Sequence, residues 1–199
     1  MQNRSFHILL IMLFCSSLLT AQSMRPKGSF QVHVGIPVNV GNESFKGFMQ
    51  GLALGSVHYQ HTLKNGLSFA GGVGYQYFSI NEFKTHQPAV GGMHSPVGFG
   101  YVGYEKIHSS SFGTDLGLRG GYSHVMFSTD RLKEVGQSPH TVPSFYFEPT
   151  FSMILFGEDL SAFKFTFGYI FQGIGFRPAY VGLTSNGSYD VNKFDDIIQ

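Results

Sequence analysis

Between residues 28 and 176, large apolar side chains alternate with small or polar ones over stretch after stretch. This two-residue period limits the fold more than any other feature of the chain. Successive side chains of a β-strand point to opposite faces of a sheet, so each stretch predicts a strand with one large apolar face and one small or polar face. The pattern predicts an all-β, antiparallel fold with strands over 30–40, 48–63, 67–79, 97–101, 116–123, 145–155 and 163–172.

The first stretch shows the alternation most clearly. One face holds Phe30, Val32, Val34, Ile36, Val38 and Val40, and the other holds Gln31, His33, Gly35, Pro37 and Asn39. The stretch 48–63 is less regular, because its apolar residues change parity between Leu54 and Val57. A β-bulge near Gly55 would restore the pattern.

The composition indicates what surrounds these strands. Charged residues make up 13% of the chain, against roughly 25% in an average soluble domain, and they are nearly absent from the strand interiors. A bilayer requires every backbone polar group to be paired, so strands that cross it must close into a barrel. We expect a membrane barrel whose large faces, including Val97, Phe99 and Tyr101, meet lipid, while small residues such as Gly98 and Gly100 line a narrow interior. A secreted, soluble β-barrel or sandwich is the alternative, since such sheets also alternate.

The gaps between the predicted strands differ in length. Residues 81–95 and 128–142 form long gaps, whereas 64–66, 106–111 and 157–161 are short. Transmembrane barrels show this asymmetry, with short periplasmic turns and long extracellular loops. The pattern therefore places the loops 81–95 and 128–142 outside the cell.

The N-terminus is typical of a secretory signal peptide. Arg4 supplies the positive charge, 8–19 is mostly apolar, and Ala21 precedes a plausible cleavage site before Gln22. We predict that residues 1–21 are cleaved and that 22–199 form a single barrel domain. The one cysteine, Cys15, leaves with the signal peptide, so disulfides do not stabilise the mature chain.

With alternating strands of about ten residues, Gly-, Tyr- and Phe-rich strand cores and no mature cysteine, the chain resembles the small, eight-stranded outer-membrane β-barrel proteins of Gram-negative bacteria. The similarity covers residues 28–176 and is one of architecture. It implies an up-and-down barrel, insertion by the barrel-insertion machinery and outer-membrane lipid as the surrounding partner.

The C-terminal tail departs from that family, whose members end in an alternating strand with a terminal aromatic residue. Residues 180–199 are rich in turn-forming and charged residues and end at Gln199. We expect 177–196 to form the last outer loop and 197–199 to begin a descent, so that the eighth strand is weak or missing. The barrel is then open between its seventh and first strands.

Several short motifs carry chemistry in other proteins. Residues 98–103 match GxGxxG, but they lie within a predicted strand rather than before a helix, so no nucleotide cofactor is predicted. His58 and His61 are three residues apart and should face opposite sides of a strand, so no metal site is predicted. Ser123 and His124 are adjacent in a predicted strand and should face opposite sides, and the pair His94-Ser95 lies in a predicted loop without a third catalytic group. A net charge of +1 also argues against a nucleic-acid partner.

The polar residues on the small faces form the one candidate site. Isolated charges in a narrow interior are unfavourable, so these side chains should pair with one another. Arg119 and Glu148 lie on strands that follow one another in the chain, and both point inward. We expect a polar network that fills the lumen, in preference to a porin-like conducting path, formed by Gln31, His33, Gln76, Asp115, Arg119, Glu148, Lys164 and Gln172.

These features predict a non-enzymatic outer-membrane protein with a structural or surface-interaction role. Loops on a rigid scaffold usually determine specificity, so an extracellular ligand would bind the loops 81–95 and 128–142. Some outer-membrane barrels modify lipids, and an enzyme acting on outer-membrane lipid is therefore a second alternative.

Overall fold

The computed structural model describes residues 27–41, 43–81, 90–157 and 161–182. The predicted signal peptide, 1–21, and the tail from 183 to 199 lie outside the described residues. The elements are β1 (Gly28–Gly35), α2 (Glu43–Phe48), β2 (Met49–Thr62), β3 (Leu67–Ile80), β4 (Gly91–Ile107), β5 (Phe112–Thr129), α3 (Asp130–Glu134), β6 (His140–Phe156), β7 (Ala162–Gly168), β8 (Phe171–Gln172) and the 3-10 helix η2 (Pro178–Val181).

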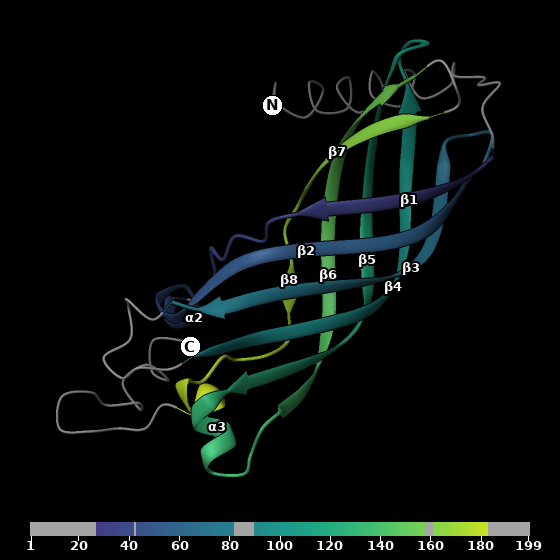
Figure 1. The fold of residues 1–199 in the computed structure, drawn as a ribbon. Coiled ribbons are helices and arrows are strands. Elements are labelled where there is room, and N and C mark those ends of the chain that lie inside the picture. The colour runs from purple at the N-terminus through teal and green to yellow at the C-terminus, as the bar shows by residue number, and fades with distance from the viewer. Residues whose placement is uncertain (1–26, 42, 82–89, 158–160, 183–199) are drawn as a thin grey trace, which may run out of the picture.

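The described strands form one antiparallel, eight-stranded sheet, which confirms the predicted fold class. β1 to β7 pair in chain order, and the sheet curls into a half-barrel (Figure 1). β8 pairs with β6 and continues β7 in the same register, since Thr150 lies opposite Gly168 and Phe147 lies opposite Phe171. The two short strands are therefore parts of one strand along β6.

Two edges of the sheet are free within the described part of the chain. β1 pairs only with β2, β7 pairs only with β6, and β1 and β7 are not paired with each other. We call the gap between these two edges the seam. It lies where the sequence predicts an open barrel.

The predicted alternation holds on most strands. The outward positions carry large side chains that are exposed, such as Phe30, Val32, Leu116, Phe145 and Phe163. The inward positions of β5 and β6 carry buried polar side chains, and those of β1 and β7 carry half-buried ones. The half-barrel is therefore apolar outside and polar along much of its inner face.

β4 corrects the prediction for 97–101. Val97, Phe99 and Tyr101 are buried on the inner face, and Gly98 and Gly100 are exposed on the outer face. The interior accepts the large rings because small residues lie beside them: the Tyr101 ring occupies the space where Gly103 and Gly117 would carry a Cβ. Alternation of size alone does not specify which face points inward.

The bulge and the two long loops also differ from prediction. The pairing of β2 with β3 shifts between Gly51 and Ala53, earlier than the expected bulge near Gly55. β4 begins at Gly91, β5 ends at Thr129 and β6 begins at His140, so the strands extend into the predicted loops 81–95 and 128–142. They extend because their ends contribute buried side chains to an apolar core at one end of the half-barrel, apart from the polar inner face.

This apolar core fills the end of the half-barrel where the long connections lie. α2, α3 and η2 gather at this end in Figure 1. Their apolar side chains pack with the strand ends in one buried cluster, which we call the cap: Phe45, Phe48, Met49, Phe78, Ile80, Met93, Val125, Phe127, Leu132, Phe176 and Val181. The Thr129 hydroxyl connects α3 to η2 within the cap, because it accepts a hydrogen bond from Leu132 N of α3 and donates one to the Val181 carbonyl of η2. No helix in the described residues is long and apolar enough to cross a membrane.

Candidate functional site: the polar lumen

All eight residues predicted for the lumen lie on the inner face of the half-barrel. β1 contributes two of them, β5 contributes two, and β3, β6, β7 and β8 contribute one each. Six of the eight belong to one connected set of hydrogen bonds and ion pairs, formed by Gln31, His33, Asp115, Arg119, Glu148 and Lys164. Gln172 instead donates to Ser95 Oγ at 3.0 Å, and Gln76 is buried on β3 apart from that set.

The first half of the network is centred on Glu148. Arg119 Nη1 lies 3.3 Å from Glu148 Oε2, and both side chains are almost fully buried. The hydroxyl of Tyr146 donates to the same carboxylate oxygen. The guanidinium of Arg119 also lies over the Phe99 ring, 5.2 Å from its centroid. The ion pair itself, the hydrogen bond from the phenol and the contact with the aromatic face thus compensate for the burial of these two charges.

The second half has the same composition around Asp115. Lys164 Nζ pairs with Asp115 Oδ2, and the hydroxyl of Tyr101 donates to Asp115 Oδ1 at 2.5 Å. Lys164 Nζ lies 5.9 Å from the centroid of the Tyr101 ring. Each buried carboxylate therefore has one cation and one tyrosine, and the charges of these four ionised groups balance.

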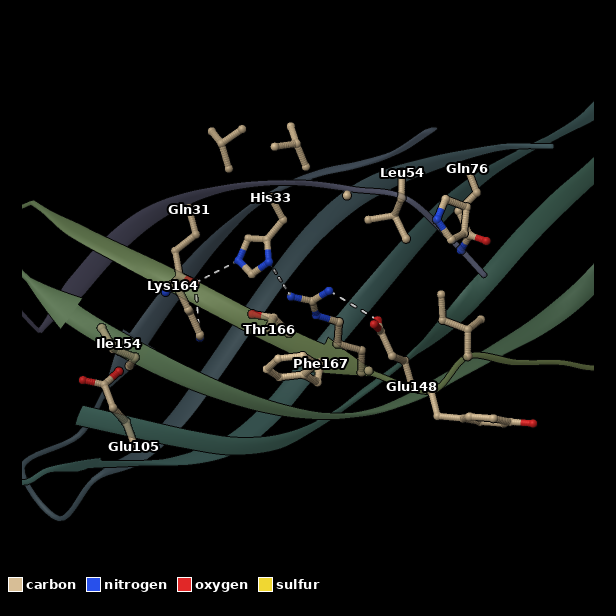
Figure 2. Close-up of a pocket in the computed structure, with 18 of the residues that line it drawn as sticks. Gln31, His33, Leu54, Gln76, Glu105, Glu148, Ile154, Lys164, Thr166 and Phe167 are labelled. Atoms are coloured by element: carbon tan, nitrogen blue, oxygen red, sulfur yellow. Dashed lines mark hydrogen bonds and ion pairs between the residues drawn. The ribbon is translucent and has the colours of Figure 1, made fainter. Parts of the chain in front are cut away.

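Two side chains of the edge strand β1 join the halves. His33 Nδ1 accepts from Arg119 Nη2 at 3.4 Å, which leaves the ring proton on Nε2 to donate to Gln31 Oε1 at 3.3 Å. Lys164 Nζ donates to the same Gln31 oxygen at 3.4 Å. Figure 2 shows Gln31, His33, Lys164 and Glu148 pointing into one space. Because Gln31 is on β1 and Lys164 is on β7, this contact spans the seam.

The alternation did not single out four further members of the site. His58 Nε2 lies 3.1 Å from Gln31 Oε1, and Gln31 Nε2 donates to Gln60 Oε1 at 2.9 Å. The apolar residues of β2 change parity along the strand, so the alternation does not show clearly that His58 and Gln60 face inward. The sequence predicts that Tyr101 faces lipid, and Tyr146 is an aromatic residue that the predicted polar set does not include.

A cavity of about 2130 Å³ lies along the inner face and extends to the seam (Figure 2). The residues that line it are polar in one part and apolar in another. His33, Arg119 and Lys164 make its middle polar, whereas Phe45 and Phe176 close it at the cap. The described residues therefore do not fill the interior as the sequence predicts: the network lines the cavity, and the cap closes one end of it.

The other sequence motifs do not converge on a reactive centre in the described residues. Ser95 and Ser123 are fully buried on the inner face, while the adjacent His94 and His124 lie on the outer face. His58 is buried and points inward, whereas His61 points outward. The described part of the chain contains no group of three or more His, Cys, Asp or Glu side chains placed to hold a metal ion.

Comparisons with protein-family models, with curated proteins and with solved structures find no match to this chain.

Proposed function

We propose that this protein is an integral outer-membrane β-barrel with a non-enzymatic, structural or surface-interaction role. Its outer face meets lipid, its lumen contains the polar network and the cap, and its long connections face the cell exterior. The barrel-insertion machinery and outer-membrane lipid are the implied partners.

One observation carries the proposal: the polarity of the sheet is the reverse of that in a soluble β protein. On β5, Leu116 is 65% exposed while the adjacent Asp115 is 2% exposed. β1 and β7 repeat this arrangement, with exposed Val and Phe residues opposite inward Gln31 and Lys164. A sheet with water on its outer face would carry polar residues there and large apolar residues in its core. Lipid suits such an outer face, and this argues against the soluble alternative.

Aromatic and histidine side chains mark the two boundaries of the apolar band. On the side of the cap, His94 lies beside Tyr75 and Tyr77 on the outer face. Tyr104 lies on the same face of β4 toward the short turns. At about 3.4 Å per residue and a tilt of about 40°, the stretch from His94 to Tyr104 spans about 26 Å along the barrel axis. This matches the ~25 Å height of the apolar band in outer-membrane barrels, which aromatic residues flank.

The cap and the paired charges support a structural role over a conducting one. Arg119, Glu148, Asp115 and Lys164 occupy the lumen as paired charges, and the cap closes one end with apolar side chains. Specificity for an extracellular partner would then come from the connections on the side of the cap, around 81–95 and 128–142. The serine–histidine pairs offer no support for a lipid-modifying enzyme, because the two side chains of each pair point to opposite faces.

Fractionation of a Gram-negative host that expresses the full chain tests the proposal. We expect the protein in the outer-membrane fraction, resistant to a carbonate wash and released only by detergent. A variant without residues 1–21 is the control and should stay in the cytoplasm. Recovery of the full chain as a soluble periplasmic or secreted monomer without detergent would overturn the proposal.

A further inference from the structure

A histidine on the outer face of β4 is held by two tyrosines of β3. Tyr75 Oη lies 2.5 Å from His94 Nδ1, and the Tyr77 ring lies against the imidazole, 4.9 Å between centroids. We assign the hydroxyl as the donor and Nδ1 as the acceptor, since a phenol is a stronger acid than a neutral imidazole N–H. The proton of the neutral ring is then on Nε2. His94 therefore presents a fixed N–H donor on the outer face.

Similar groups lie on the neighbouring strand. In the register of β4 with β5, His94 lies opposite Met126, which places His124 diagonally beside it on the same face. Tyr122 contacts the His124 ring edge-on at 5.4 Å. We call Tyr75, Tyr77, His94, Tyr122 and His124 the rim cluster. It carries hydrogen-bond donors and aromatic rings but no carboxylate, so it complements an anionic acceptor.

Next to the rim cluster, Gly98 and Gly100 leave a strip of the outer face of β4 without side chains, which we call the groove. Gly98 and Gly100 form its floor, and a Cβ added at Gly98 would meet no atom within 4 Å. Val73 and Tyr122 lie opposite Gly98 on the two neighbouring strands and form its walls. Both wall residues are exposed. These are the first two glycines of the GxGxxG sequence at 98–103.

We propose that the rim cluster and this groove together bind one phosphate-bearing membrane lipid. The headgroup phosphate accepts the hydrogen bond of His94 Nε2, with His124 and the tyrosine hydroxyls beside it. An acyl chain lies over Gly98 and Gly100. The inference rests on the proposed membrane location, because only there does the outer face of β4 meet lipid.

Native mass spectrometry of the detergent-solubilised full protein tests the inference. The probes are dipalmitoyl phosphatidic acid and dipalmitoylglycerol, which share their acyl chains and differ in the phosphate. We expect the wild type to retain phosphatidic acid about tenfold more than diacylglycerol, since one charge-assisted hydrogen bond is worth about that factor. His94→Ala should abolish this preference. Tyr75→Phe should reduce it about threefold, because Nδ1 then no longer has its donor and Nε2–H is no longer fixed.

Two further variants distinguish binding of the headgroup from binding of the acyl chain and from a general effect on the fold. Gly98→Leu fills the groove and should reduce retention of both lipids. His61→Ala removes an outward histidine near the opposite boundary and should change neither. Equal retention of the two lipids by the wild type, or an unchanged preference in His94→Ala, would overturn the inference. Displacement of phosphatidic acid by excess inorganic phosphate would also overturn it, because the site would then bind free phosphate. The fractionation experiment decides the membrane location separately.

Discussion

Arg119 and Glu148 lie directly opposite each other on β5 and β6, and an ion pair of 3.3 Å joins them inside the half-barrel. Both side chains are about 7% exposed, so water screens this pair very little. A buried pair of this kind adds little to stability as a whole, but removal of one member leaves the other charge without compensation. The pair therefore determines the arrangement of side chains in the lumen more than the stability of the barrel.

A double-mutant cycle tests this relationship. Glu148→Leu should lower the free energy of unfolding by about 3–5 kcal/mol, because it leaves a buried guanidinium unpaired. Adding Arg119→Met should recover most of that loss, since no unpaired charge then remains. Urea unfolding in lipid vesicles measures all four proteins. Simple addition of the two single effects would show that the residues do not act as a pair.

Two glycines of β5 should differ sharply when replaced by alanine. A Cβ at Gly117 would lie 2.3 Å from Tyr101 Cε2, so Gly117→Ala must displace the ring that donates to Asp115. We expect a loss of about 1–3 kcal/mol in the free energy of unfolding. Gly120→Ala is the matched control, because its Cβ would meet nothing within 4 Å, and its effect should stay within about 0.5 kcal/mol. Equal effects would contradict the position of Tyr101.

The cap should depend on Phe176. This side chain is 2% exposed, and its ring packs edge-on against Phe45 at 5.2 Å and also contacts Phe127. Phe176→Ala should lower the free energy of unfolding by about 3–5 kcal/mol, the usual range for a buried phenylalanine. Val135→Ala, in the exposed segment after α3, should change it by less than about 0.5 kcal/mol. A small effect of Phe176→Ala would show that the cap is loosely packed.

Strand alternation was sufficient to predict the sheet and much of its interior. Gln31, Asp115, Glu148 and Lys164 face inward because each alternates with exposed apolar neighbours. The pairing of Arg119 with Glu148 followed from their inward parity on strands that are consecutive in the chain. Alternation was sufficient on strands whose small face carries polar residues, whereas on β4 it placed Val97, Phe99 and Tyr101 on the wrong face.

The remaining features depend on contacts between distant segments. Tyr101 faces inward because Gly117, on the next strand, leaves room for its ring, and no local pattern encodes that match. His58 and Gln60 lie beyond the bulge of β2, whose position depends on pairing with β3. The cap escaped prediction because α2 and α3 are short, and their apolar residues become buried only in the cluster that they form with distant strand ends and Phe176.

The most direct test of the account is whether arginine on the outer face is unfavourable in lipid. Val73 of β3 is an exposed residue opposite Gly98, near the middle of the apolar band, and Val135 is an exposed apolar residue outside the strands. Free energies of unfolding in lipid vesicles should fall by about 2–4 kcal/mol for Val73→Arg, because the charge enters the bilayer core. They should change by less than about 0.5 kcal/mol for Val135→Arg. If the two substitutions have equally small effects, the outer face does not lie in lipid and the membrane-barrel account is wrong.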